Sequence, residues 1–161
     1  MEFRKTDPKI KAAVDAVIQE EWGGPMVVTK GNLIDTAQNP GFVCVENDRL
    51  LGFITYMLRG EVCEITVLTV LDENKGIGTK LISLVTQEAK RCGCKRVFLI
   101  TTNDNTHAIR FYQKRGFSLA AVHLNALEAS RKRKPGIPMH GMDGIPLLHE
   151  FEFEMMIGEG M

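Results

Sequence analysis

The sequence predicts an α/β protein with a central mixed, mostly antiparallel sheet and helices on both of its faces. Apolar runs of strand length follow one another from residue 42 to residue 71, which favours antiparallel hairpins. The order strand, helix, strand then follows over 61–101, which is typical of a βαβ unit with two parallel strands. Two more strand-like runs, 117–124 and 147–157, complete the sheet.

The elements of the first third alternate between helix and strand patterns. Lys9–Glu21 has apolar residues at helical spacing, and Trp22-Gly-Gly-Pro25 ends that helix. Gly31–Ala37 is expected to form a second short helix. Phe42–Val45 and Leu50–Met57 flank a polar four-residue loop, which predicts a hairpin.

The middle of the chain carries the predicted parallel pair. Glu61–Leu71 is rich in β-branched residues and is expected to be a strand. Gly78–Arg91 has one apolar stripe of a helix, and Val97–Thr101 is a continuous apolar run typical of an interior strand. Thr106–Arg115 is the next expected helix, which Asn105 introduces.

Length and composition limit the function classes. The 161 residues fit a single domain over 1–161, with 44% hydrophobic and 25% charged residues, as in ordinary globular proteins. A formal net charge of zero argues against a nucleic-acid partner and leaves a homodimer open. No apolar run is long enough for a bilayer, and no signal peptide is recognisable, so we expect a cytoplasmic protein without a membrane partner. The four cysteines lack metal-ligand spacing, so no metal is expected.

A glycine turn at the start of the 78–91 helix is the strongest functional signal. Gly76 and Gly78 let the backbone bend sharply and approach a ligand. The helix start has unpaired N–H groups and the positive end of the helix dipole, so it favours a phosphate or pyrophosphate.

A second motif makes the interpretation of the glycine turn more specific. It is Asn105-Thr-His-Ala108-Ile-Arg-Phe111-Tyr112-Gln-Lys-Arg-Gly116-Phe117. Together with the glycine turn, it resembles the GNAT superfamily of N-acetyltransferases, with core motifs over 61–117. The resemblance implies the GNAT fold, with a parallel splayed pair in its sheet, and acetyl-CoA as cosubstrate without a metal.

The resemblance also implies which residues contact the cofactor. The strand segment Leu68-Thr69-Val70 would line the pantetheine arm, and the turn would bind the pyrophosphate through Lys75, Gly76, Ile77, Gly78, Thr79 and Lys80. Glu73 departs from the family pattern, which has Gln or Arg at that position. Asn103 and Asn105 follow the predicted parallel strand, where ligands bind in open sheets. Asn105 is expected to cap the helix or to bind the pantetheine amides, and we expect both uses within this pair. Ala108 and Phe111 complete the cofactor set, with Phe111 packing under the cofactor.

Two residues are candidates for the chemistry. Tyr112 aligns with the tyrosine that many family members use as general acid, and a phenol can protonate a departing thiolate. Glu64 stands at the offset where some members place a catalytic base, although a substrate anchor fits equally well, and Glu61 is its rival. Strict strand alternation would place Glu64, Thr66, Leu68 and Val70 on one face.

The connection 125–146 is expected to be a long, irregular but ordered loop on the acceptor side. Trp22, Glu128 and Arg131 are the candidate acceptor-binding residues, because a cationic amine needs a carboxylate and an anionic group needs an arginine. The sequence thus predicts an N-acetyltransferase for a small-molecule or peptide amine. The alternatives are a non-catalytic acyl-CoA-binding regulatory module and a protein-modifying acetyltransferase.

Overall fold

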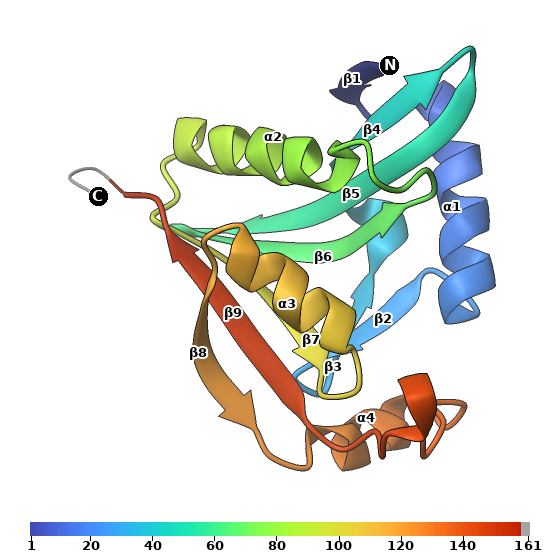
Figure 1. The fold of residues 1–161 in the computed structure, drawn as a ribbon, viewed down its shortest axis with the longest axis vertical. Helices are drawn as coiled ribbons and strands as arrows, with labels where there is room; N and C mark the ends of the chain where they lie inside the picture. The colour runs from blue at the N-terminus through green and yellow to red at the C-terminus, as the bar shows by residue number, and fades with distance from the viewer. Residues whose placement is uncertain (159–161) are drawn as a thin grey trace. The chain divides into compact units, whose positions relative to one another are not determined.

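The computed structural model describes residues 1–158 and contains two compact units. The first unit comprises residues 1–27, 35–97 and the chain from 156 on; the second comprises 28–34 and 98–155. The strands of the main sheet follow the order β1-β4-β5-β6-β7-β9-β8, with β6 and β7 parallel and the remaining pairs antiparallel (Figure 1). The mixed α/β sheet predicted from the sequence is confirmed.

Four antiparallel strands and the start of β7 (Arg96–Thr102) make the sheet of the first unit. They are β1 (Glu2–Lys5), β4 (Gly41–Glu46), β5 (Arg49–Arg59) and β6 (Val62–Val70). The predicted hairpin is therefore present, whereas β1 was not predicted. At the start of β7, the N–H groups of Lys95 and Arg96 both donate to the carbonyl of Glu61, so β7 begins beside β6.

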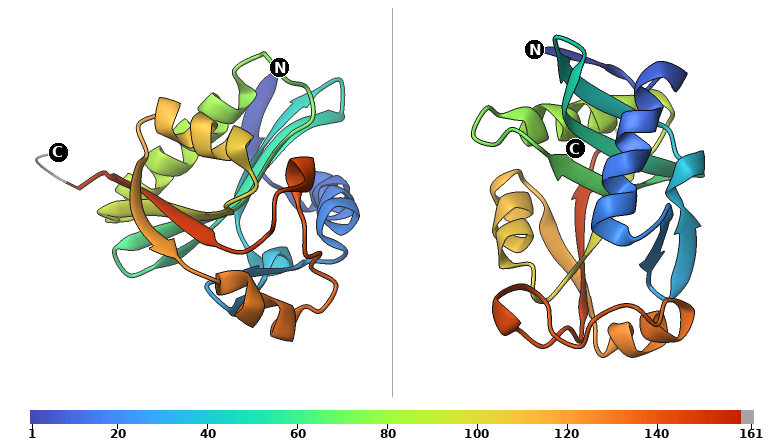
Figure 2. Two further views of the ribbon diagram at one scale, coloured as in Figure 1. Left: turned by 60° about the horizontal axis from the view of Figure 1, so that its bottom comes forward. Right: turned by 90° about the vertical axis from the view of Figure 1, so that its right-hand side faces the viewer.

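Helices α1 (Pro8–Trp22) and α2 (Ile77–Arg91) cover opposite faces of this sheet, as Figure 2 shows. The register explains why. Gly52 lies directly beneath Ile77 and Leu81 of α2, and a Cβ at Gly52 would approach the Ile77 side chain to 2.9 Å. Thr69 faces the other way, because it pairs with Phe53, and its hydroxyl donates to Glu21 of α1 at 3.0 Å.

The predicted short helix over Gly31–Ala37 is wrong. The chain instead forms a separate two-stranded hairpin, β2 (Met26–Thr29) and β3 (Asn32–Asp35), followed by a 3₁₀ turn, η1 (Thr36–Gln38). Lys30 and Gly31 connect the strands with φ values of 51° and 76°. Two consecutive positive φ values are those of a type I′ turn, which suits the twist of a tight hairpin.

The second unit contains the rest of β7 and all elements up to β9. They are α3 (Thr106–Lys114), β8 (Ser118–His123), α4 (Ala126–Arg133), the 3₁₀ turn η2 (Met142–Gly144) and β9 (Glu150–Met156). Helix α3 and strands β7, β8 and β9 agree with the sequence prediction. Helix α4 does not, since that segment was expected to be irregular. Within residues 1–158, no helix is both long and apolar enough to cross a membrane.

Candidate active site

The site residues predicted from the sequence are divided between the two units. The first holds Trp22, Glu64, the 68–70 segment of β6 and the glycine turn 75–80; the second holds Asn103, Asn105, Ala108, Phe111, Tyr112, Glu128 and Arg131.

The glycine turn begins α2 in the conformation that only glycine adopts readily. Gly76 is the N-cap with φ 73°, and a Cβ there would meet no atom within 4 Å. It provides no side chain to cap the helix, and the first turn of α2 contains no acidic residue. A helix start without a side-chain cap and without an acidic residue in its first turn is a good anion site.

Charged side chains of both signs lie at the turn. Lys75, on the exposed turn, pairs with Asp72 at 2.7 Å. This hydrogen bond with Asp72 raises the pKa of Lys75. Glu73, the departure from the family pattern, lies outside the helix and is exposed. Gly78 is buried in the first turn of α2.

A β-bulge in β6 changes which residues share a face. Val67 pairs with Thr55 and Ile65 pairs with Tyr56, so Thr66 has no partner of its own in β5. Paired residues share a face, and a bulge shifts the alternation by one residue. The predicted alternation is therefore wrong: the α1 face carries Glu64, Thr66, Val67 and Thr69, and the α2 face carries Cys63, Ile65, Leu68 and Val70.

Polar side chains gather on the α1 face of β6. The Thr66 hydroxyl lies 2.7 Å from that of Thr55 and donates to Asn39 Oδ1 at 2.8 Å. The Thr69 hydroxyl binds the carboxylate of Glu21, which immediately precedes Trp22. The exposed Trp22 at the end of α1 is thereby placed near the 68–70 segment of β6.

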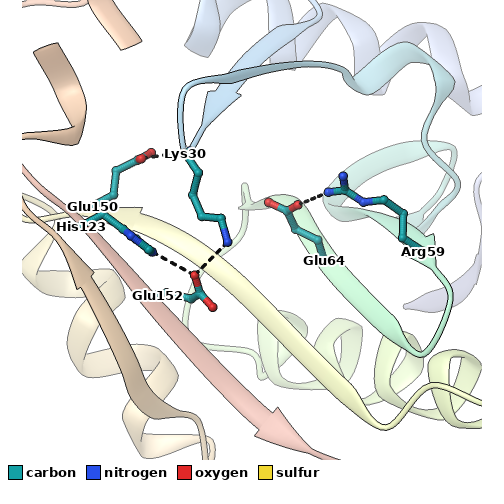
Figure 3. Close-up of polar contacts among 6 residues, drawn as sticks. All are labelled: Lys30, Arg59, Glu64, His123, Glu150 and Glu152. Atoms are coloured by element: carbon teal, nitrogen blue, oxygen red, sulfur yellow. Dashed lines mark hydrogen bonds and ion pairs between the residues drawn. The ribbon is translucent and has the colours of Figure 1, made fainter. Parts of the chain in front are cut away.

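Glu64 is a buried carboxylate held by an exposed arginine (Figure 3). Arg59 Nη2 donates to Glu64 Oε1 at 3.0 Å, and the exposed side-chain fractions are 65% for Arg59 and 3% for Glu64. The two residues are diagonal neighbours on one face, since Glu64 pairs with Met57, two residues before Arg59. The guanidinium stabilises the carboxylate form of Glu64. The rival, Glu61, is instead exposed beside Lys95 at 3.4 Å.

Tyr112 is the buried aromatic residue of α3, and Phe111 is only half-buried. The Tyr112 ring meets Phe111 and Phe117 edge to face, with centroids 5.2 Å and 5.6 Å away. Burial raises the pKa of Tyr112. Its hydroxyl has no hydrogen-bond partner among residues 1–158, so its proton is available to a ligand.

The two asparagines already make hydrogen bonds within the protein. Asn105 caps α3, because its Oδ1 accepts from the N–H of Ala108 at 3.0 Å. Asn103 Oδ1 accepts from the N–H groups of Leu148 and His149 at 3.0 and 2.9 Å. Its Nδ2 donates to the carbonyl of Pro146 at 2.9 Å. Asn103 therefore has little capacity left for a pantetheine amide, whereas the Asn105 amide nitrogen keeps it.

Arg131 also lies against the chain segment that Asn103 holds. Its Nη2 donates to the carbonyls of Pro138 and Leu147 at 2.9 and 2.6 Å, and its Nε is buried without a hydrogen-bond partner. In this arrangement Arg131 orders the loop from within and does not reach outward. Glu128, in the first turn of α4, is exposed.

Sequence reasoning missed a buried charged cluster in the second unit (Figure 3). Glu150 and Glu152 of β9 are 2% and 6% exposed. Lys30 binds both, with its N–H donating to Glu150 at 3.0 Å and its Nζ to Glu152 at 3.2 Å. His123 Nε2 lies 3.0 Å from the same Glu152 oxygen. The alternation Glu-Phe-Glu-Phe-Glu of β9 was a usable signal, because three carboxylates on one strand face require partners.

Comparisons with known proteins give a matching family model and a relative that covers most of the chain. A family model described as the acetyltransferase (GNAT) family matches residues 8–117. The uncharacterized protein YdhI of Bacillus subtilis (strain 168) is 43% identical over 139 residues, which is 86% of this chain and 87% of that protein.

Solved structures share the fold at low sequence identity. A GNAT family acetyltransferase from Elizabethkingia anophelis with acetyl-CoA bound is similar with a TM-score of 0.68 and 19% identity, covering 96% of this chain and 97% of that one. The ribosomal-protein-S18-alanine N-acetyltransferase of Escherichia coli is similar with a TM-score of 0.68 and 14% identity, covering 99% and 97%.

Proposed function

Because the chain belongs to the acetyltransferase (GNAT) family, we propose that it is an acetyl-CoA-dependent N-acetyltransferase that acts on a primary amine. The observation that carries the proposal is the glycine turn. Gly76 begins α2 without a side-chain cap, and the turn directly follows β6, the strand expected to line the pantetheine arm. The acetyl-CoA bound to the similar Elizabethkingia protein supports this cosubstrate.

In the proposed reaction, the amine nitrogen attacks the thioester carbonyl carbon, a C–N bond forms and the C–S bond breaks. The ammonium form must first lose a proton, which Glu64 accepts directly or through water. A backbone N–H near Val70 stabilises the developing oxyanion. Tyr112 then protonates the departing thiolate, and the tyrosinate regains a proton through water from the amine nitrogen, which must lose a second proton to give the amide. The products are an acetamide and CoA, and the reaction needs no metal.

The ion pair at Glu64 favours a specific role for this carboxylate. A base within hydrogen-bond distance of a guanidinium is held in its charged form, ready to accept a proton but weakened as a base. A cationic amine also binds a buried carboxylate well. We therefore propose that Glu64 first anchors the ammonium group and then relays its proton.

Two alternative functions use parts of the same site. A regulatory module that binds acyl-CoA would need neither Glu64 nor Tyr112, and the ion pair with Arg59 fits such a module too. A protein-modifying acetyltransferase would use the same chemistry on a peptide amine, as the name of the Escherichia coli neighbour states for that enzyme.

Four free cysteines fit a reducing compartment, so we place the protein in the cytoplasm.

Thiol release in an amine panel tests the proposal. The panel contains spermidine, tyramine, glucosamine, kanamycin and a lysine-containing peptide, each incubated with acetyl-CoA and the protein. The proposed function predicts release of CoA with at least one amine, above the rate without amine. Binding of acetyl-CoA in calorimetry together with no release from any amine would favour the regulatory module. Release with the peptide alone would favour the protein-modifying enzyme.

A further inference from the structure

The loop between α4 and β9 contains a small hairpin with few stabilising contacts of its own. The N–H of Leu147 donates to the carbonyl of Met139 at 2.9 Å, and the N–H of Gly141 donates to that of Ile145 at 2.8 Å. The 3₁₀ turn η2 closes the tip. A two-stranded hairpin this short is marginal in water, so the 139–147 hairpin needs anchoring from outside.

One buried carboxylate supplies an anchor. Asp104 is 5% exposed, and its Oδ2 accepts from the N–H of Met142 at 2.9 Å. Its Oδ1 accepts from the Thr102 hydroxyl. A Cβ at Gly141 would lie 2.0 Å from Asp104 Oδ2, so only glycine lets the hairpin approach the carboxylate this closely.

The same carboxylate belongs to the turn between β7 and α3. The carbonyl of Asp104 accepts from the N–H of Thr106 at 2.9 Å, and the next residue, Asn105, caps α3. Asn103, the preceding residue, binds Pro146 on the other side of the hairpin and Leu148 just after it. Ligands of open α/β sheets bind at the carboxyl ends of strands, and this turn is the carboxyl end of β7.

We propose that Asp104 is a positioning residue for the acetyl transfer. It fixes the 139–147 hairpin against the β7–α3 turn, and the hairpin thereby forms one wall of the acceptor site. Acceptor binding therefore depends on Asp104, while acetyl-CoA binding, which rests mainly on the glycine turn of the first unit, does not. The inference rests on the proposed function for its acceptor but not for the anchoring of the hairpin.

Two variants remove the anchor, and a third is their matched control. Asp104→Asn keeps the shape but removes the charge, so the Met142 N–H loses its charge-assisted hydrogen bond. Gly141→Ala keeps the Asp104 carboxylate, but the added Cβ pushes the hairpin and the carboxylate apart. Gly136→Ala lies in the same loop, where a Cβ meets nothing within 4 Å and φ is not positive. The measurements are KM for the amine that gives the fastest thiol release, acetyl-CoA affinity by calorimetry, and hydrogen exchange of residues 138–148.

A lost charge-assisted hydrogen bond corresponds to about a tenfold change or more in an equilibrium constant. We expect the first two variants to raise KM for the amine by about tenfold and to lose protection in the hairpin, with acetyl-CoA affinity and Gly136→Ala unchanged. An unchanged KM in variants whose hairpin has lost its protection would overturn the proposal, and so would an equal loss of acetyl-CoA affinity. If the wild-type protein acetylates no amine, the proposed function fails; unchanged hairpin protection in Asp104→Asn would then separately refute the anchor.

Discussion

Replacing Tyr112 by Phe should separate catalysis from folding. The Tyr112 hydroxyl has no hydrogen-bond partner among residues 1–158, so its removal breaks no hydrogen bond described there. The ring keeps its edge-to-face contacts with Phe111 and Phe117. The free energy of unfolding should therefore change by less than about 1 kcal/mol. Loss of a general acid should lower kcat by about 10²–10⁴-fold, which corresponds to about 3–5 kcal/mol of activation free energy.

The assay is single-turnover thiol release at saturating acetyl-CoA, together with urea denaturation of the same samples. Tyr56→Phe is the matched control, because Tyr56 is the other tyrosine of the chain, is 5% exposed and stacks on Phe42. The control should leave kcat nearly unchanged. Wild-type turnover in Tyr112→Phe would show that the thiolate leaves without help and that Tyr112 serves packing alone.

Three further predictions test the turn, the base and the titration of the phenols. Gly76→Asp should keep α2, because Asp tolerates positive φ and favours helix starts. Calorimetry should nevertheless show acetyl-CoA binding more than tenfold weaker, because the new carboxylate repels the pyrophosphate. The control Gly93→Asp, at another open position with φ 84°, should bind acetyl-CoA normally. Glu64→Gln should lower the rate most near neutral pH if Glu64 relays the proton, whereas a change in KM alone would leave only the anchoring role. Burial raises the pKa of Tyr112, and it raises that of Tyr56 to about 12. Tyrosinate absorbance should therefore not appear in the folded protein near pH 10. The free energy of unfolding should keep its full tyrosine contribution below about pH 10 and fall as the pH rises through the pKa values of the folded state.

The fold followed from periodicity wherever an element was long or strongly patterned. The β6–α2–β7 order and the Asn105 cap were visible in the sequence because each has a local signal. Helix α4 was missed because it lacks an apolar stripe: only Leu127 and Ser130 of this helix are buried. The β2–β3 hairpin was missed because its strands have only four residues each. In addition, lysine rarely adopts a positive φ, so Lys30 gave no signal for the turn.

The sequence indicates which residues are candidates for the site, but it does not show which groups their side chains contact. A bulge cannot be read from alternation, so the side of β6 that Thr66 and Thr69 face became clear only from the pairing with β5. The hydrogen bonds of Asn103 reach chain segments more than 40 residues away, and those of Arg131 reach carbonyls 7 and 16 residues away, so no local pattern reveals them. In α3, Tyr112 is buried and Phe111 is only half-buried, although Phe111 has the more apolar side chain.

The most direct test of the central claim is the identity of the product made from acetyl-CoA. Acetyl-CoA labelled with ¹³C in the acetyl group is incubated with the protein and the amine that gives the fastest thiol release, and the products are analysed by mass spectrometry and NMR. An N-acetyltransferase predicts one labelled acetamide on a primary amine for each CoA released, with Tyr112→Phe slow and Tyr56→Phe normal. CoA released with labelled free acetate, or with label on a hydroxyl group, would contradict the account.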